Sequence, residues 1–169
     1  MSDFNEQVID ALRANDGVLT DGPLAGQQLL LLTHKGARTG TIRTNPLGYY
    51  DSSDGADYLR CTCCAGLSGE GLRTVAPEVV GFFACIGTPV LFASGMGAPT
   101  HPQWVFNLRA HPDVAVELGG HAFGATAREV DGAEYDGLWA RVIEDKPFLV
   151  QHQTMAGARR IPLIRLETT

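Results

Sequence analysis

Three basic side chains stand close together in the stretch HKGARTGTIRTNPLGYY, residues 34–50, one residue after an apolar run of four leucines. Lys35, Arg38 and Arg43 fall within nine residues of a chain whose formal net charge is −6. Gly36 and Gly40 lie among them, and the missing side chain of a glycine lets a ligand approach the backbone closely. Because a guanidinium binds phosphate or carboxylate bidentately, the pattern favours a local anion site. The alternative is a solvent-exposed turn with three unrelated surface charges.

One histidine, His152, lies in the stretch FLVQHQ. An imidazole exchanges protons near neutral pH and can serve as a general acid in an apolar pocket. A lone histidine is also often a structural hydrogen-bonding residue, and the sequence leaves both interpretations open.

The four cysteines do not predict a metal site. Three of them fall in CTCC and the fourth is Cys85, whereas zinc sites use pairs spaced as C-x-x-C together with further Cys or His ligands. We expect reduced, buried or half-buried thiols and no metal.

Composition limits the classes of protein to which the chain can belong. Its 169 residues, 44% of them hydrophobic, predict one compact domain over residues 1–169. The 19 Asp and Glu residues outnumber the 13 Lys and Arg residues, which argues against nucleic acid or an anionic membrane as partner. The first residues lack the pattern of a signal peptide, and no apolar run reaches the roughly 18 residues that span a bilayer. We expect a soluble, cytoplasmic protein.

Hydrophobic spacing predicts a mainly β protein with flanking helices, an α+β fold. Glycine pairs such as Gly119-Gly120 indicate tight hairpins between antiparallel strands. No G-x-G-x-x-G motif opens a helix, as a dinucleotide-binding Rossmann fold would require. The sequence therefore favours a small antiparallel barrel over a parallel Rossmann sheet. Apolar and alternating runs predict strands near 28–34, 42–51, 57–61, 89–94, 113–118 and 121–130 and within RRIPLIRLE, and helices at about 3–14, 101–111 and 132–145.

Four ordered blocks resemble one family. LLLLTHKGARTGTIRTNPLGYY, FASGMGAPTHPQWVFNLRAHPDVAVELGG, AREVDGAEYDGLWARV and FLVQHQTMAGARRIPLIRLE are similar to segments of the deazaflavin (F420)-dependent nitroreductase family. The resemblance implies a split β-barrel like that of the FMN-binding pyridoxine phosphate oxidases. It also implies hydride transfer from reduced coenzyme F420, an 8-hydroxy-5-deazaflavin with a phosphate and a polyglutamate tail, to a small hydrophobic quinone, nitroaromatic or activated alkene.

The resemblance also implies roles for individual residues. The anionic tail would contact the basic loop, the backbone of TNP would border the deazaflavin ring, and the segment ASGMGAPTHPQW would form the other wall. FLVQHQ corresponds to a short helix on the substrate side, where His152 takes the place of a tyrosine. The implied cofactor-binding residues are Lys35, Arg38, Thr39, Arg43, Thr44, Asn45, Pro46, Ala93, Ser94, Gly95, Gln103 and Trp104; the catalytic residues are Ser94 and His152; the substrate pocket is formed by Phe82, Phe83, Phe148 and His152.

Two departures from the family leave alternatives open. Gly95 stands where many relatives have Lys or Asn, so FMN is an alternative coenzyme, and a non-catalytic binding protein for a deazaflavin, a flavin or an apolar ligand is an alternative function. Residues at about 61–88 resemble an insertion, which would form a lid carrying Phe82 and Phe83, part of a homodimer interface, or a plain loop with a short buried helix.

Overall fold

The computed structural model describes residues 3–52 and 88–168. The expected strand at 57–61, the four cysteines, Phe82 and Phe83 lie outside the described residues, as does the expected insertion except for its last residue.

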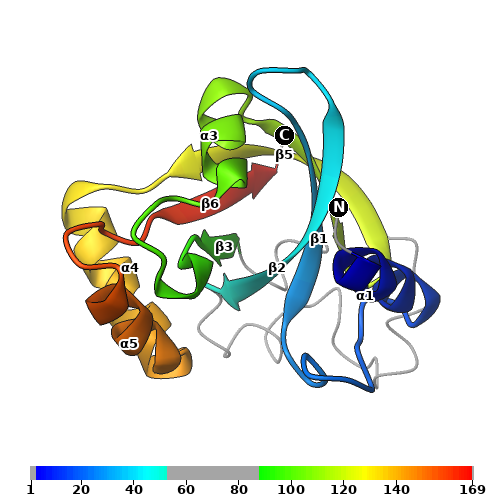
Figure 1. The fold of residues 1–169 in the computed structure, drawn as a ribbon, viewed down its shortest axis with the longest axis horizontal. Coiled ribbons are helices and arrows are strands. Elements are labelled where there is room, and N and C mark those ends of the chain that lie inside the picture. Colours follow the sequence, from blue (N-terminus) through cyan, green and yellow to red (C-terminus); the bar gives the residue numbers. More distant parts are fainter. Residues whose placement is uncertain (1–2, 53–87, 169) are drawn as a thin grey trace, which may run out of the picture.

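Six antiparallel strands close into a barrel, as the sequence predicts (Figure 1). Each strand pairs with two neighbours in the order β1-β2-β3-β6-β5-β4, and β1 closes the barrel by pairing with β4. The strands are β1 (Leu29–Lys35), β2 (Ile42–Asp51), β3 (Pro89–Phe92), β4 (Asp113–Leu118), β5 (His121–Glu129) and β6 (Leu163–Thr168).

Helices cover the outside and the ends of the barrel (Figure 1). They are α1 (Asp3–Ala14), α3 (Gln103–Ala110), α4 (Gly132–Asp145) and α5 (Phe148–Met155), with a short 3-10 turn, η2 (Gly95–Gly97), between β3 and α3. Hydrophobic spacing predicts α1, α3 and α4 to within two residues, whereas α5 was indicated only by the family resemblance. No helix in the described ranges is long and apolar enough to span a bilayer.

The strand β1 is buried on both faces, which explains its unbroken run of leucines. Leu30 and Leu32 point into the barrel core, whereas Leu29 and Leu31 pack outward against α1, and all four are at most 6% exposed. Burying one leucine side chain stabilises a fold by roughly 1.5–3 kcal/mol. Because side chains alternate along a strand, the next inward position after Leu32 is His34.

Two turns shape the ends of the strands. Between β4 and β5, Gly119 and Gly120 have φ angles of 56° and 77°, as a two-residue type I′ hairpin requires. At the tip of β1 and β2, Gly36 N donates to Thr41 O at 2.8 Å and Gly40 N donates to Gly36 O at 2.9 Å. The second turn holds the basic loop in a defined conformation.

Candidate active site

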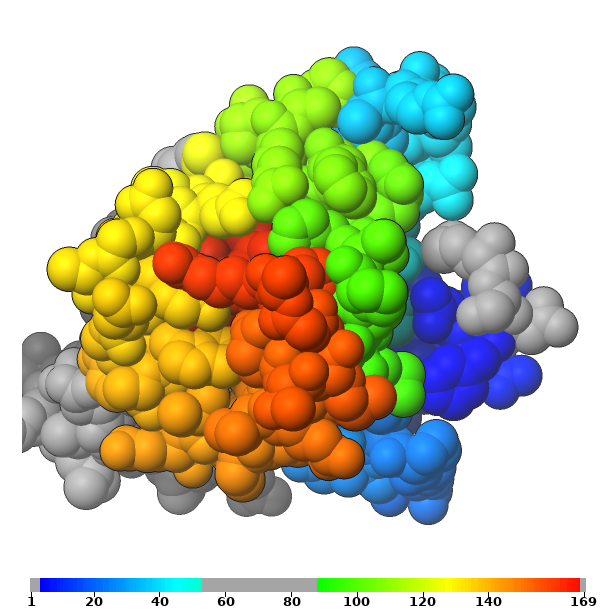
Figure 2. Space-filling view, turned by 60° about the vertical axis from the view of Figure 1, so that its left-hand side comes forward, coloured from blue at the N-terminus to red at the C-terminus, as the bar shows by residue number. Residues whose placement is uncertain are grey.

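A polar cavity lies between the β1–β2 hairpin tip and α3. In Figure 2 the hairpin tip, in light blue and cyan, stands beside the green helix. We call this space the α3 cavity. Its volume is about 600 Å³, and it is lined by His34, Gly36, Ala37, Arg38, Thr39, Arg43, Asn45, Gln103, Trp104 and Asn107.

Positive charge dominates the α3 cavity. Arg38 and Arg43 are both exposed, and no Asp or Glu is among the ten lining residues. Elsewhere arginines are paired: Arg13 lies 2.6 Å from Glu117, and Arg109 lies 2.8 Å from Glu129. Within residues 3–52 and 88–168, neither Arg38 nor Arg43 makes an ion pair. Two unpaired guanidinium groups beside a cavity without carboxylates can bind an anion that the rest of this acidic surface repels.

The floor of the cavity is a buried chain of hydrogen bonds. His34 and Asn107 are only 2% and 3% exposed. Ala37 N donates to Asn107 Oδ1 at 3.0 Å, Asn107 Nδ2 lies 3.3 Å from His34 Nδ1, and His34 Nε2 lies 2.9 Å from Asn45 Oδ1. We call these groups the His34 relay. It ties the basic loop, β1, β2 and α3 together.

Strand alternation decides which side chains of β2 reach the cavity. Arg43 and Asn45 face it, and Leu47, two residues further, packs against the barrel core. Thr44 therefore lies on the opposite face, where its Oγ1 lies 2.8 Å from Thr33 Oγ1, and Pro46 shares that face. The side chains of Thr44 and Pro46 do not line the cavity, so only their backbone remains available to a ligand there.

Other predicted cofactor residues differ in their surroundings. Trp104 combines two roles that the sequence treated as alternatives, because it packs against the barrel core and also lines the α3 cavity beside Gln103. Thr39 lines the cavity, but its hydroxyl donates to Thr41 Oγ1 at 2.9 Å and so stabilises the loop itself. Lys35 is exposed and is not part of the lining.

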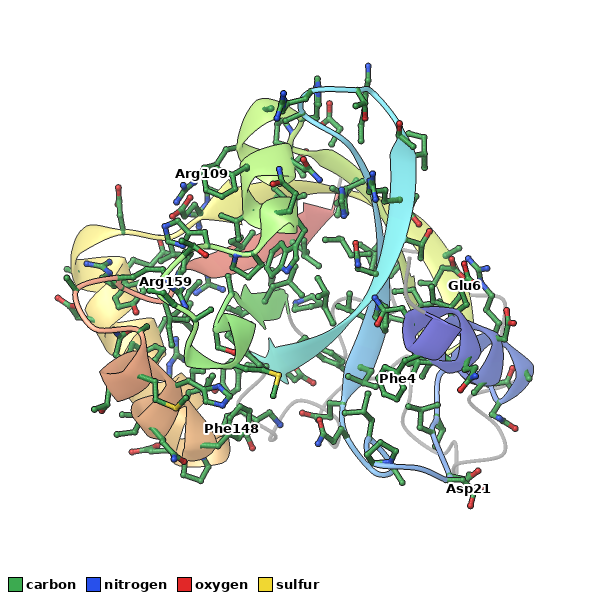
Figure 3. All side chains as sticks on the ribbon, in the orientation of Figure 1. Phe4, Glu6, Asp21, Arg109, Phe148 and Arg159 are labelled. Atoms are coloured by element: carbon green, nitrogen blue, oxygen red, sulfur yellow. The ribbon has the colours of Figure 1, made fainter. Side chains whose placement is uncertain are left out.

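The predicted second wall is a turn fastened by Arg159. Ala93 and Ser94 are 1% and 8% exposed. The guanidinium of Arg159 donates to the carbonyl oxygens of Ala93, Ser94 and Ala98 at 3.0, 2.6 and 2.8 Å. Arg159, labelled in Figure 3, lies beside this loop. Partial burial lowers the pKa of the Arg159 guanidinium below its ordinary value. None of Ala93, Ser94 and Gly95 lines the α3 cavity.

The turn packs directly against α5 and brings the two predicted catalytic residues into one region. A Cβ added at Gly97 would lie 2.6 Å from Met155 Cβ and 3.1 Å from His152 O, so only glycine permits this approach. Gly97 N also donates to Ser94 O at 3.0 Å. The Nδ1 atom of His152 is buried without a hydrogen-bond partner in the described part of the chain. Ser94 thus begins the turn whose Gly97 packs against α5, the helix that carries His152.

A second cavity lies beside the start of α5. Its volume is about 440 Å³, and it is lined by Phe92 and Phe148 together with Gly26, Gln27, Gln28, Gly48, Asp145 and Lys146. The rings of Phe92 and Phe148 meet edge to face at 6.1 Å, and the Phe148 ring meets that of His152 at 5.3 Å. We call this space the α5 cavity. Phe148 lines it as the predicted substrate pocket requires, whereas His152 reaches it only through Phe148.

Comparisons with known proteins identify the family. A model described as F420H(2)-dependent quinone reductase matches residues 72–168. The F420H(2)-dependent quinone reductase of Mycobacterium tuberculosis is 30% identical over 139 residues, which cover 81% of this chain and 71% of that protein. The chain belongs to this family.

Solved structures agree with the family on fold and chemistry. An F420-H2 dependent reductase, FDR-A, has a TM-score of 0.57 and 27% identity, covering 82% of this chain and 93% of its own. A domain-swapped dimer has a TM-score of 0.58 and 27% identity, covering 96% and 95%. The split-barrel fold, the oxidoreductase class and coenzyme F420 are thereby confirmed. The matching descriptions name F420H(2), whereas the FMN and non-catalytic binding alternatives stay untested predictions.

Sequence reasoning missed His34, Asn107 and Arg159. His34 could have been found, since it continues the inward series of Leu30 and Leu32. Asn107 lies on α3 facing the barrel, where a buried amide in an apolar helix is the available signal. Arg159 bonds to carbonyls more than 60 residues away, and nothing in its local sequence indicates that contact.

Proposed function

We propose that this F420H2-dependent reductase reduces a quinone, with the anionic part of the coenzyme in the α3 cavity and the quinone on the α5 side. The observation that carries the proposal is a pair of arginines, Arg38 and Arg43, that form no ion pair with another described residue and line a cavity with no Asp or Glu among its described lining residues. The donor set fits the coenzyme, because a phosphate and a row of carboxylates need fixed positive charge and hydrogen-bond donors.

Arg38 and Arg43 would hold the phosphate and glutamate carboxylates, and the Trp104 indole would offer an aromatic face to the ring. The reduced coenzyme, when bound, supplies the hydride. The turn at Ser94, fastened by Arg159, would keep the ring wall in place and exclude water. Positioning of this kind contributes much of the rate when a cofactor carries the chemistry.

His152 would supply the proton. A quinone that accepts one hydride and one proton becomes a hydroquinone, so a proton donor near the acceptor oxygen completes the two-electron reduction. His152 Nδ1 has no hydrogen-bond partner among the described residues, and the His152 ring contacts the Phe148 ring that lines the α5 cavity. Phe148 and Phe92 offer apolar contacts to the quinone ring.

The binding half is tested by fluorescence titration of Arg43→Ala with coenzyme F420. Loss of one charge-assisted contact should weaken binding about tenfold or more. Arg13→Ala is the matched control, because Arg13 is an exposed arginine on α1 that pairs with Glu117 outside the α3 cavity. Equal affinities of the two variants and the wild type would remove the anion site.

The substrate half is tested by steady-state reduction of a quinone, a nitroaromatic and an activated alkene of similar size with F420H2. We expect the highest kcat/KM for the quinone. A higher value for the nitroaromatic or the alkene would overturn the choice of quinone while leaving the coenzyme site intact.

We also propose a homodimer, and the supporting observation is that one structural neighbour is a domain-swapped dimer. Light scattering coupled to size-exclusion chromatography would give the mass in solution. A mass equal to the 18.1 kDa chain would contradict the dimer.

A further inference from the structure

The His34 relay has a direction that one backbone group fixes. The Ala37 N–H can only donate, so its partner Asn107 Oδ1 accepts. The other end of that carboxamide, Nδ2, can only donate, and its partner is His34 Nδ1. His34 Nδ1 must therefore offer a lone pair, and the single N–H of a neutral imidazole then lies on Nε2.

The same donor and acceptor assignment fixes the orientation of the Asn45 carboxamide at the α3 cavity. His34 Nε2–H donates to Asn45 Oδ1 at 2.9 Å, so the oxygen of the Asn45 carboxamide is occupied. The NH2 group of Asn45 has no partner within the described ranges, and Asn45 lines the α3 cavity. Without the relay the carboxamide could present either its oxygen or its nitrogen to a ligand.

We propose that His34 and Asn107 are positioning residues that hold the Asn45 carboxamide as a hydrogen-bond donor to an acceptor atom of the coenzyme. This rests on the proposed coenzyme site. Asn45 follows Arg43 by two residues on the same strand face, about 6.6 Å further from the hairpin tip. Arg43 binds the charged part of the coenzyme, and Asn45 meets the part that carries neither phosphate nor carboxylate.

The near burial of the relay supports this role. Two polar side chains only 2% and 3% exposed occupy the end of an apolar barrel, where a leucine at either position would continue the core. Burying polar groups does not stabilise a fold more than apolar packing of the same shape does. We therefore explain the presence of His34 and Asn107 by the orientation they impose on the Asn45 carboxamide, and not by a gain in stability of the fold.

The substitution Asn107→Asp reverses the relay without changing its shape. A carboxylate still accepts from Ala37 N, but it presents a second acceptor to His34 Nδ1, which must then carry a proton. In the neutral imidazole His34 Nε2 then carries the lone pair, Asn45 donates to it, and the Asn45 oxygen turns to the cavity. The Asn45 group that faces the α3 cavity thus changes from a hydrogen-bond donor to an acceptor, while the side chain at residue 107 keeps its length.

The first readout uses no coenzyme. Nitrogen-15 NMR of labelled protein distinguishes the two imidazole tautomers of His34. We expect the Nε2–H form in the wild type and the Nδ1–H form in Asn107→Asp. A wild-type Nδ1–H tautomer would overturn the proposal whether or not the variant folds.

The second readout is affinity for the deazaflavin chromophore that lacks the phosphate and glutamates. We expect Asn107→Asp to weaken its binding about tenfold, and Arg43→Ala to leave it within about twofold. Ile42→Asp is the control for added charge, since Ile42 is 64% exposed on the strand face opposite Arg43, and it should also stay within twofold.

The outcomes separate the proposal from the function on which it rests. A switched tautomer with unchanged chromophore affinity would overturn the positioning role while the coenzyme site stands. An equal loss in Ile42→Asp would show a charge effect and would also overturn it. Failure of the wild type to bind the complete coenzyme would remove the proposed function, and the positioning role with it.

Discussion

Replacing Arg159 by alanine should loosen the turn after β3, because one guanidinium holds three backbone carbonyls there. The oxygens of Ala93, Ser94 and Ala98 accept from it at 3.0, 2.6 and 2.8 Å. In the variant the Ser94 oxygen keeps a bond from Gly97 N, whereas the other two carbonyls lose their partner in Arg159.

The magnitude follows from those two carbonyls. A buried carbonyl without a partner costs about 1–3 kcal/mol. Because Arg159 is only half-buried, water replaces part of what it supplies, and we expect a loss of about 2–3 kcal/mol in the free energy of unfolding. For a chain of this length that corresponds to a Tm lower by roughly 4–12 °C. Quinone reduction should fall as well, since the Ser94 turn borders the proposed ring site.

Urea unfolding and thermal unfolding measure the effect, with two companion variants. Arg160→Ala removes the neighbouring arginine, whose guanidinium stacks on Tyr135 at 3.4 Å, and should cost at most about 1 kcal/mol. Arg159→Lys keeps the charge but cannot reach three carbonyls, so its loss should be intermediate. If Arg159→Ala proved as stable as Arg160→Ala and kept its activity, the proposal that Arg159 fastens the turn would be refuted.

Three further predictions address the α5 contact and the acid limb of stability. Gly97→Ala should lower the free energy of unfolding by about 2–4 kcal/mol and reduce activity, because the new Cβ would overlap α5. Gly132→Ala is the control: its new Cβ meets nothing within 4 Å, so the loss should be only about 1 kcal/mol. Equal losses of the two variants in urea unfolding would contradict this prediction. His152→Phe should lower kcat about 100-fold with little change in Tm, and an unchanged kcat would exclude proton donation. Hydrogen bonding to Arg128 lowers the pKa of Glu134 from 4.5 to about 2, so this pairing contributes above pH 4.5 and is lost as the pH falls towards 2. Glu134→Gln should flatten that part of the stability curve, and an unchanged acid limb would rule the pairing out as a contributor.

The elements were predictable where local chemistry determines them. The double-sided apolar run of β1, the alternation in β4 and β5, and the glycine pair between them each have one reasonable structural interpretation. The helix α5 has no such pattern: it follows Pro147, only Leu149 is buried, and Phe148 and Val150 are exposed. Its position depends on the turn against which it packs, which the local sequence does not encode.

The sequence indicated the charged residues of the candidate site, but it did not indicate the residues that hold the surrounding backbone in place. Arg38 and Arg43 stand out because positive charge is locally concentrated in an acidic chain. Alternation on β2 separates Asn45, which faces the α3 cavity, from Thr44, which does not. Arg159 acts through contacts that exist only after the barrel closes, so no spacing rule reveals it.

The most direct test of the central claim is an equilibrium fluorescence titration of the wild-type protein with coenzyme F420 beside FMN, repeated over a series of salt concentrations. We predict saturable binding of F420, much weaker binding of FMN, and an affinity for F420 that falls as salt rises, because charge–charge contacts at exposed arginines are screened. An F420 affinity independent of salt would contradict an anion site formed by Arg38 and Arg43, and equal binding of FMN would contradict F420 as the coenzyme.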